Sequence, residues 1–279
     1  MVLQSSTSTG ANGSRPNRSP KTSPSGPRRR NEIPFSTRLL TALRSAQHVA
    51  VLTGAGISAE SGVPTFRSND GLWKQFKPEE LATFEGFIRN PALVSAWYAE
   101  RRKIIREVVP NAGHHALAHL EACVPRLSLI TQNIDGLHQK AGSRHVIELH
   151  GNIHRNICMQ CRQVSTQEEL PSSTMPPQCH CGGLIRPDVV WFGELLPTEA
   201  FDAASNAAAS CDVFLSVGTS AVVYPAASLP TLAKQHGARL VEVNIERTDL
   251  SPYADDCLIG PAGVILPDLI ETLKAEWSR

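Results

Sequence analysis

Short runs of consecutive apolar residues recur along the chain, separated by longer stretches in which apolar residues stand three or four positions apart. The short runs predict strands buried on both faces, and the spaced positions predict helices with one apolar side. This alternation is typical of an α/β fold, in which helices cover both faces of a mostly parallel sheet. The predicted strands are Val49–Leu52, Leu127–Ile130, Val146–Leu149, Val189–Phe192, Val213–Val217 and Leu240–Val243, and the predicted helices are Phe35–Ala46, Pro78–Arg89, Pro91–Val109, Ala112–Cys123, Thr198–Ala209, Pro225–His236 and Pro267–Trp277.

Residues 152–186 interrupt this alternation with few large apolar side chains and four cysteines in two close pairs. Such a small inserted module cannot support a core of its own without a staple. Four soft thiolates form the ligand set of a closed, tetrahedral zinc site, which is structural because no position stays open for water. The second pair encloses His180, an alternative ligand in place of one thiolate. The predicted zinc ligands of this zinc-ribbon module are Cys158, Cys161, Cys179 and Cys181.

The other cysteines bear on the redox compartment. Cys123, Cys211 and Cys257 stand singly in apolar surroundings. This is typical of core thiols in a reduced, intracellular protein, and it disfavours two disulfides among the clustered four. We therefore expect a cytoplasmic protein. No apolar run approaches the roughly 18 residues that span a bilayer, so we expect no membrane partner.

Residues 1–32 form a tail rich in Ser, Pro, Gly and Arg, and the first 30 carry six basic and no acidic residues. We expect this tail to be disordered, because it cannot bury enough apolar surface to order itself. The alternative is a mitochondrial transit peptide, and with it the mitochondrial matrix, although four prolines oppose an amphipathic helix. The folded domain is then 33–279. With 21 basic and 26 acidic side chains beyond residue 30, it predicts no nucleic-acid-binding surface.

Three predicted strands lead directly into segments suited to a nucleotide. In the segment 54–58, glycines let a pyrophosphate approach the free N–H groups of a helix end. Because any tight strand-to-helix turn needs glycine, this motif alone is weak evidence. The segments 218–220 and 244–246 repeat the arrangement, and three such ends converging on one crevice of a Rossmann-like sheet predict a bound dinucleotide. The candidate residues are Gly54, Ala55, Gly56, Ser58, Gly218, Thr219, Ser220, Asn244 and Glu246.

A polar loop and a histidine follow two further strands. Gln132, Asn133 and Asp135 stand where ligands of open α/β sheets bind, and their side chains suit a ribose or a carboxamide. His150 follows the next strand, and although a lone histidine is more often structural, its place on the same crevice indicates a neutral general base toward a ribose hydroxyl. The histidines predicted to be surface or packing residues are His114, His115, His119, His138, His145 and His154.

Tyr98 and Arg101 lie three residues apart, so they share one face of the predicted helix Pro91–Val109. The same segment carries several further charged residues. Spacing alone therefore favours a solvated face over a binding site. The charged neighbours are Glu100, Arg102, Lys103 and Arg106.

Seven motifs in a fixed order resemble those of the sirtuins, and together they cover the chain from about residue 38 to residue 275. The resemblance implies NAD-dependent removal of acyl groups from lysine side chains of proteins by an enzyme that is a monomer by default. The motifs are GAGISAESGVPTFRSNDGLW (54–73), TQNIDGLH (131–138), LHG (149–151), the cysteine quartet, VVWFGE (189–194), GTSAVVYPAA (218–227) and NIE (244–246).

The resemblance also implies a mechanism and further site residues. The acyl oxygen attacks the ribose carbon of NAD⁺ as nicotinamide leaves, and His150 deprotonates a ribose hydroxyl that attacks the resulting intermediate, which gives O-acyl-ADP-ribose. The polar loop residues Gln132, Asn133 and Asp135 contact the nicotinamide end. The segment Val190–Glu194 pairs with the substrate peptide as an added strand. Further expected contacts are Phe66, Arg67 and Ala262 for the cofactor, and Val190, Phe192, Gly193 and Glu194 for the substrate.

One sirtuin class, the mitochondrial and bacterial desuccinylase type, carries a Tyr-x-x-Arg pair at the place of Tyr98 and Arg101. There the pair binds the distal carboxylate of succinyl- or malonyl-lysine, and the arginine fork matches a carboxylate. The chain departs from this class at Asp188, where histidine is expected, and an acid there would weaken binding of anionic acyl groups. Cys-His-Cys in the zinc module is a second departure. We predict removal of succinyl, malonyl or glutaryl groups, with weaker deacetylation.

Three alternatives stay open. The enzyme could act mainly as a protein-lysine deacetylase. A dehydrogenase that uses NAD as a hydride carrier would share the fold class, but no matching substrate site supports it. A non-catalytic NAD-binding or zinc-ribbon interaction module would keep the same motifs without turnover. Release of free nicotinamide in the presence of an acyl-lysine peptide excludes the last of these.

Overall fold

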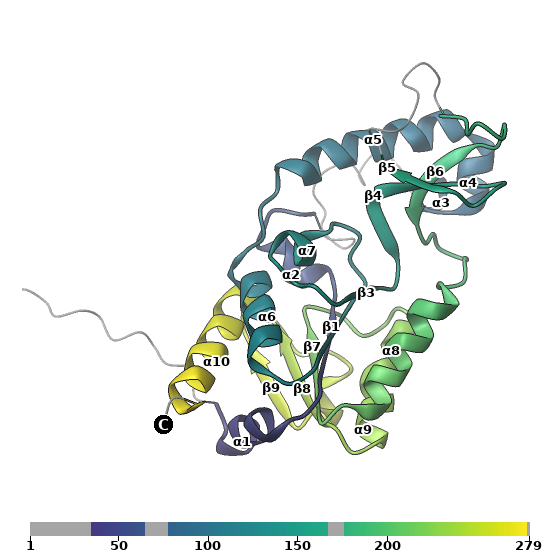
Figure 1. Cartoon of the computed structure of the whole chain (residues 1–279). Coiled ribbons are helices and arrows are strands. Elements are labelled where there is room, and N and C mark those ends of the chain that lie inside the picture. Colours follow the sequence, from purple (N-terminus) through teal and green to yellow (C-terminus); the bar gives the residue numbers. More distant parts are fainter. Residues whose placement is uncertain (1–34, 65–77, 167–175, 278–279) are drawn as a thin grey trace, which may run out of the picture. The chain divides into compact units, whose positions relative to one another are not determined.

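The computed structural model describes residues 35–64, 78–166 and 176–277, and its largest element is a six-stranded sheet (Figure 1). The strands follow in the order β3-β2-β1-β7-β8-β9, and all of their pairings are parallel. Their carboxyl ends therefore share one edge, where loops distant in the sequence meet. The strands are β1 (Val49–Thr53), β2 (Leu127–Thr131), β3 (Val146–Glu148), β7 (Val213–Val217), β8 (Arg239–Asn244) and β9 (Asp256–Ile259).

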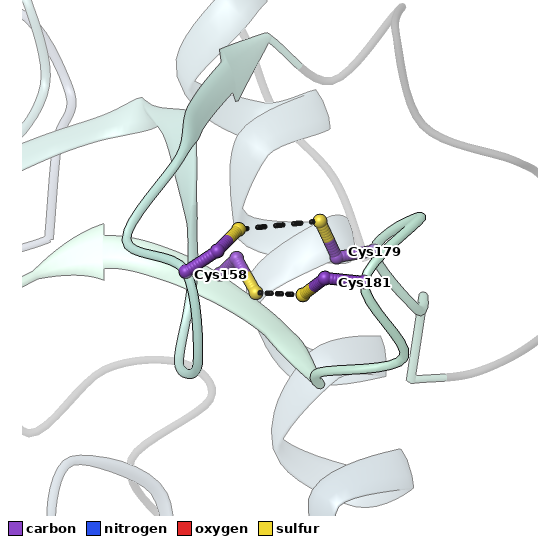
Figure 2. A group of neighbouring side chains, drawn as sticks. Cys158, Cys179 and Cys181 are labelled. Atoms are coloured by element: carbon purple, nitrogen blue, oxygen red, sulfur yellow. Dashed lines mark hydrogen bonds between the residues drawn. The ribbon is translucent and has the colours of Figure 1, made fainter.

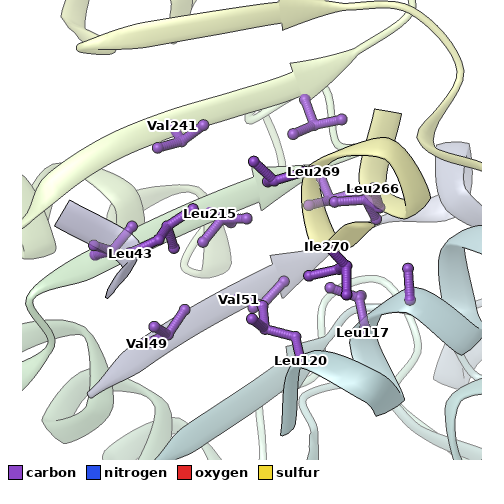
Figure 3. Close-up of a cluster of buried hydrophobic side chains, with 14 of the residues drawn as sticks. Leu43, Val49, Val51, Leu117, Leu120, Leu215, Val241, Leu266, Leu269 and Ile270 are labelled. Carbon is purple, nitrogen blue, oxygen red and sulfur yellow. The ribbon is translucent and has the colours of Figure 1, made fainter. Parts of the chain in front are cut away.

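The central strand β1 is buried along its whole length. Val49 and Val51 point to one face of the sheet, where Figure 3 shows them in a cluster of buried apolar side chains. Ala50 and Leu52 belong to the cluster on the other face. Because side chains alternate across a strand, helices on both faces require apolar residues at every position. The predicted parallel sheet with helices on both faces is confirmed. The helices are α1 (Thr37–Ser45), α6 (Ala112–Cys123) and α10 (Ala262–Trp277) on the first face, and α8 (Thr198–Ser210) and α9 (Leu229–Gln235) on the second.

Side-chain caps set where several helices begin. The Ser36 hydroxyl accepts a hydrogen bond from the Leu39 N–H over 3.1 Å and so caps α1. Asn90 caps α5 (Pro91–Glu107) in the same way, with proline at the first helical position. Each such cap contributes about 1 kcal/mol to stability. Four short helical elements complete this part of the fold: α2 (Ala55–Ala59), α7 (Leu137–Lys140), η3 (Ala226–Ser228) and η4 (Ser251–Tyr253).

A second, smaller region consists of a three-stranded antiparallel sheet, in the order β5-β4-β6, and three helices. We call it the small region. Its sheet alone is too small to enclose a core, and α5 with the two short helices before it supplies the missing wall. Its elements are α3 (Pro78–Leu81), α4 (Phe84–Arg89), α5, β4 (Gly151–Cys158), β5 (Val164–Thr166) and β6 (Ile185–Val189). Its buried apolar residues are Leu81, Ala82, Phe87, Val94, Trp97, Tyr98, Ile105, Ile153, Val189 and Trp191.

The predicted strand Val189–Phe192 is wrong. The strand of this part of the chain is β6, which pairs antiparallel with β4 instead of continuing the parallel sheet. In the run 189–192, Val189 and Trp191 are buried because they face the core of the small region, whereas Phe192 is exposed. The predicted helix Pro78–Arg89 is also wrong in part, since it breaks before Thr83, whose hydroxyl caps α4.

Two further elements differ from the prediction near the C-terminal end. The strand β9 was not predicted, because four residues at a sheet edge carry no periodic signal. The last helix begins at Ala262, and Pro267 lies inside it although proline is typical of a first helical turn. Within the described ranges, no helix combines the length and the apolar character needed to cross a membrane.

Candidate active site

Two glycine turns meet where β1 and β7 end. The Gly54 N–H donates to the Val217 carbonyl over 3.0 Å, and the Gly56 N–H donates to the Gly218 carbonyl over 2.8 Å. A Cβ atom on Gly56 would lie 2.7 Å from the Cα of Gly218. A Cβ on Gly218, whose φ is +59°, would lie 2.5 Å from the Ile57 nitrogen. No side chain fits between the turns, so they offer only backbone to a ligand.

The loop that follows β2 lies against the first of these turns. Asn133 Nδ2 donates to the Gly54 carbonyl over 3.0 Å and to Ser58 Oγ over 3.1 Å, and the Ser58 hydroxyl donates to Asp135 Oδ2 over 2.7 Å. Burial raises the pKa of Asp135, although hydrogen bonds from the Leu137 N–H and the Ser58 hydroxyl oppose the rise. The structure thus brings three predicted side chains into one hydrogen-bonded group.

His150 lies between β3 and β4, and its ring is tied to the same loop. Its Nδ1 lies 2.8 Å from the Gln132 carbonyl oxygen. Because a carbonyl only accepts, Nδ1 carries the hydrogen and Nε2 keeps a free lone pair. Burial lowers the pKa of His150 from its ordinary 6.5, so the imidazole is neutral at neutral pH. Gly151 has a φ of +76°, and a Cβ there would lie 2.1 Å from the Asp188 carbonyl oxygen, so no other residue fits beside the histidine.

A cavity of about 240 Å³ opens beside the second glycine turn. Asn244 Nδ2 donates to the Thr219 carbonyl, and Gln132 Nε2 donates to Thr219 Oγ1, each over 3.0 Å, so the cavity wall is continuous with the loop that holds His150. Hydroxyl, amide and carboxylate groups in such a wall suit a nucleoside. The predicted residues that line the cavity are Gly218, Thr219, Ser220, Asn244 and Glu246, and those not predicted are Val222, Arg247, Thr248 and Asp249.

The remaining predicted cofactor contacts are Phe66, Arg67 and Ala262. Phe66 and Arg67 lie outside the described residues. Ala262 is buried where α10 begins, and the next residue, Gly263, donates its N–H to Glu60 Oε1 over 2.9 Å. This contact ties the start of α10 to the end of the helix α2 that the first glycine turn opens.

Two histidines predicted to be surface or packing residues are buried and also hydrogen-bonded below the polar loop. His138 Nε2 lies 2.9 Å from Thr53 Oγ1, His114 Nε2 lies 3.4 Å from Ser58 Oγ, and the two ring centroids are 4.9 Å apart. Burial lowers the pKa of His114 to about 4 and that of His138 to about 3. Both rings are therefore neutral, and their hydrogen bonds help to hold Thr53 and Ser58 in place at the site. Periodicity could not reveal this, because α7 is a single turn.

Tyr98 and Arg101 are buried on α5, with 4% and 8% of their surface exposed, so the solvated face predicted from spacing is wrong. Trp191 Nε1 donates to the Tyr98 hydroxyl oxygen over 3.0 Å, and the Arg101 guanidinium lies 5.2 Å from the ring centroid of Trp97. Burial raises the pKa of Tyr98 to about 12 and lowers the pKa of Arg101. The charge of Asp135 opposes the second shift, which puts Arg101 within electrostatic reach of the polar loop.

The segment after β6 is held by its backbone amides. The Val190 N–H donates to the His150 carbonyl over 3.0 Å, and the Phe192 N–H donates to the Ala82 carbonyl over 2.9 Å. Phe192 is 51% exposed, and a Cβ on Gly193 would meet open space. The segment therefore joins the histidine to the small region and presents one side to solvent.

Glu194 does not point a free carboxylate outward. Arg186 donates to both of its oxygens, over 2.8 and 2.9 Å, and lies 4.0 Å over the ring of Trp191. The Trp191 N–H also donates to Glu194 Oε2 over 2.8 Å. This bidentate ion pair closes the turn after Val190, so Glu194 shapes the segment through its side chain.

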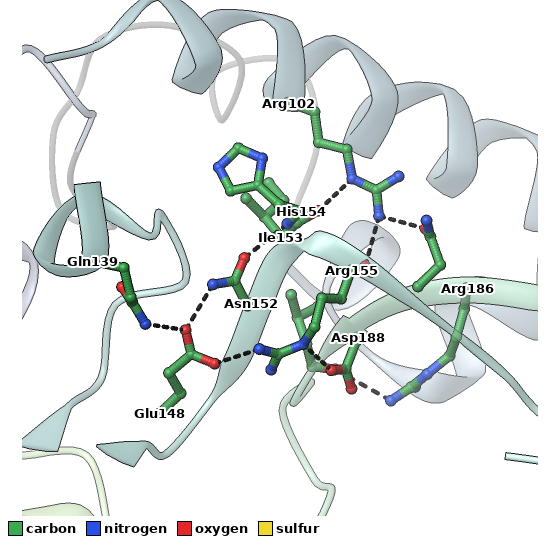
Figure 4. Close-up of polar contacts among 11 residues, drawn as sticks. Arg102, Gln139, Glu148, Asn152, Ile153, His154, Arg155, Arg186 and Asp188 are labelled. Carbon is green, nitrogen blue, oxygen red and sulfur yellow. Dashed lines mark hydrogen bonds and ion pairs between the residues drawn. The ribbon is translucent and has the colours of Figure 1, made fainter. Parts of the chain in front are cut away.

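The carboxylate of Asp188 is also paired. Arg155 donates to Asp188 over 2.9 Å and to Glu148 over 2.7 Å, as Figure 4 shows. Glu148 accepts further hydrogen bonds from Gln139 and Asn152. The carboxylate expected to weaken the binding of anionic acyl groups therefore shares the cation Arg155 with Glu148, in a network that links β3 of the large sheet to β4 and β6.

The four clustered cysteines bring their sulfur atoms within 4.8 Å of one another (Figure 2). The Sγ atoms of Cys158 and Cys181 are 3.5 Å apart, and those of Cys161 and Cys179 are 3.6 Å apart. Tetrahedral zinc with bonds of about 2.3 Å separates its sulfurs by roughly 3.8 Å, so the four thiols fit one ion. The four cysteines provide a full tetrahedral ligand set, so His180 is not needed as a ligand. Its Nδ1 lies 3.5 Å from Cys179 Sγ.

Comparison with known proteins agrees with this geometry. The family model described as Sir2 family matches residues 54–225. NAD-dependent protein deacylase 2 of Pyrobaculum aerophilum is 55% identical over 233 residues, which cover 83% of this chain and 93% of the relative. The NAD-dependent protein deacylase of Aquifex aeolicus is 54% identical over 209 residues, which cover 75% of this chain and 87% of the relative.

Solved structures give the same result. A Sir2 homologue in complex with NAD superposes with a TM-score of 0.82 at 42% identity, over 89% of this chain and 97% of that chain. A Sir2 protein with a p53 peptide and NAD⁺ superposes with a TM-score of 0.75 at 33% identity, over 87% and 98% of the two chains. With this match in sequence and fold over most of its length, the chain belongs to the Sir2 family, the sirtuins.

Proposed function

We propose that this NAD-dependent protein deacylase prefers lysine acyl groups that end in a carboxylate, namely succinyl, malonyl and glutaryl groups, and removes acetyl groups more slowly. The observation that carries the proposal is the buried pair of Tyr98 and Arg101 on α5. A guanidinium and a phenol held together beside the polar loop form a site for an anion at the end of an acyl chain.

Burial of Arg101 supports this assignment. Removing a guanidinium from water costs free energy, which the lowered pKa of Arg101 reflects, and the planar guanidinium fork matches the two oxygens of a carboxylate. Trp191 already donates to the Tyr98 oxygen, so the phenol hydrogen is left to donate to the same carboxylate. A pKa of about 12 keeps Tyr98 protonated at neutral pH.

The arrangement around His150 supports the proposed reaction. Bound NAD supplies an electrophilic ribose carbon and nicotinamide as the leaving group. Gln132, Asn133 and Asp135 hold the nicotinamide end, and the glycine turns offer backbone N–H groups to the pyrophosphate. His150 Nε2, with its free lone pair, accepts a proton from a ribose hydroxyl.

The segment Val190–Glu194 is the proposed docking strand for the substrate peptide. The amides of Val190 and Phe192 are engaged within the protein, so the pairing uses the outward carbonyl groups of the segment and the open side of Gly193. The structural zinc keeps the small region, and with it this strand, in place. We propose residues 33–279 as the catalytic domain.

The proposal is tested by mass spectrometry of two peptides that differ only in the acyl group, acetyl or succinyl, each incubated with NAD⁺. We expect faster loss of the succinyl group, with one nicotinamide released for each acyl group removed. Faster loss of acetyl would favour the deacetylase alternative. Nicotinamide reduction without acyl loss would indicate a dehydrogenase, and no turnover of either peptide would indicate a binding module.

The tail lies outside the described residues, so its disorder, its possible targeting role and the cytoplasmic location stay predictions. The monomeric state and the lack of a nucleic-acid partner are proposals as well. Light scattering on the purified protein tests the first of these. A mass well above the 30.2 kDa of one chain would contradict it.

A further inference from the structure

Arg102, the neighbour of Arg101, is buried and reaches from α5 to β4 (Figure 4). Its Nε donates to the Ile153 carbonyl, and its Nη2 donates to the Arg155 carbonyl over 3.0 Å and to Asn156 Oδ1 over 2.5 Å. These three acceptors are neutral and belong to one stretch of β4. Burial lowers the pKa of Arg102 to about 10, so the guanidinium stays charged at neutral pH.

The acceptors lie where the pairing of β4 with β6 is irregular. Asn152 pairs with Asp188, and the next paired residue, Asn156, faces Pro187, so residues 153–155 have no partner on β6. An irregular strand leaves backbone carbonyls without ladder partners, and a buried carbonyl needs a donor. The planar fork of Arg102 supplies several donors at once to the irregular stretch.

Arg102 shares a stripe of α5 with Tyr98, four residues earlier. Tyr98 is held by Trp191, and Arg102 is held by β4, so two polar contacts one turn apart fix how α5 is rotated about its axis. The direction in which Arg101 leaves the helix follows from that rotation. A rotation of α5 about its own axis would therefore move Arg101 away from the polar loop, even if no residue that contacts the acyl-lysine were substituted.

We propose that Arg102 is a positioning residue for the acyl-carboxylate site: it locks the rotation of α5 against the irregular stretch of β4 and so aims Arg101 and Tyr98 at the end of the acyl chain. This inference rests on the proposed function. An acetyl group has no carboxylate for the pair to bind, so we expect its removal not to depend on the lock. Arg102 thereby sets acyl preference without contacting the substrate.

The test is Arg102→Lys, which keeps the charge and removes the fork. We expect the KM for a succinyl-lysine peptide to rise by about tenfold, while kcat/KM for the matched acetyl peptide changes by less than about threefold. Arg106→Lys makes the same change one turn further along α5, at an exposed position, and should alter neither value. A general loss of structure would lower kcat/KM for both peptides together. A different effect on the two peptides therefore indicates a positioning role.

Asn156→Ala removes one acceptor of Arg102 and leaves both carbonyls, so it decides the matter if Arg102→Lys does not fold. We expect a smaller rise in the KM for the succinyl peptide, about threefold, with acetyl removal unchanged. Equal effects on both peptides, or none on the succinyl peptide, would overturn the role of Arg102. A wild-type enzyme without preference for the succinyl peptide would instead overturn the proposed function.

Discussion

The crevice at the edge of the large sheet and the small region are held together by different parts of the chain. In the crevice, the two glycine turns contact each other through backbone atoms. The N–H groups of Gly54 and Gly56 donate hydrogen bonds to the carbonyls of Val217 and Gly218, and a Cβ on either glycine would clash with backbone. In the small region, side chains make the connections. Arg102 bridges α5 to β4, and Trp191 binds Tyr98.

The difference separates two tasks. The crevice combines close backbone contacts with a hydrogen-bonded group of side chains, and this fixed geometry suits a reaction that is the same for every acyl group. A helix held by a few side chains can be re-aimed by single substitutions while the sheet is left intact. We therefore expect changes in the crevice to affect all substrates alike and changes in the small region to affect the choice of acyl group.

Removal of zinc tests the small region most severely. Structural zinc contributes roughly 10 kcal/mol to the folding of small modules, so a tight chelator should unfold residues 151–189 while the parallel sheet persists. Limited proteolysis followed by mass spectrometry should then find new cleavage sites, absent from the zinc-loaded protein, only in the small region. Unfolding of the whole chain in one step, or resistance to the chelator, would break the distinction between the two parts.

His150→Tyr tests the crevice. Loss of the base should lower turnover of both acetyl and succinyl peptides by at least about 10³-fold, because the proton acceptor for the ribose hydroxyl is removed. Circular dichroism should show an unchanged fold. Retained turnover of either peptide would refute the base role of His150.

Gly56→Ala tests whether the crevice tolerates a single methyl group. Its Cβ would lie 2.7 Å from the Cα of Gly218, and the resulting shift should cost about 3 kcal/mol in the free energy of unfolding. Gly142→Ala is the matched control, because it also adds a methyl group, at a φ of +104°, but meets no atom within 4 Å. It should cost only about 1 kcal/mol. Equal losses in urea unfolding would show that the close contact is unimportant.

The buried histidines make a smaller, pH-dependent contribution. His138 has its pKa lowered to about 3 from 6.5, so the unfolded chain binds more protons between these values and stability falls as the pH drops below 6.5. The loss is on the order of 1.4 kcal/mol per pH unit for one histidine. His138→Gln should flatten this slope between pH 6.5 and 4.5 in urea unfolding. An unchanged slope would mean that His138 is not neutral in the folded protein.

The sequence predicted the crevice better than the small region, and the reason is physical. Buried runs such as Val213–Val217 and glycine turns are local signals, so the strand ends and five of the nine residues that line the cavity were predicted. The places of Tyr98 and Arg102 depend on β4 and Trp191, which are distant in the chain, so their burial left no local pattern. The apolar run 189–192 was misread for the same non-local reason, since Val189 and Trp191 are buried in the core of the small region and not in the large sheet.

The separation of reaction from acyl choice is tested most directly by Arg101→Met, measured as kcat/KM for matched succinyl- and acetyl-lysine peptides with NAD⁺. The substitution keeps the bulk of the side chain and removes the partner of the acyl carboxylate. We predict a loss of about 100-fold for the succinyl peptide and less than about threefold for the acetyl peptide. An equal loss for both peptides would contradict the account, since Arg101 would then serve the common reaction and not the choice of acyl group.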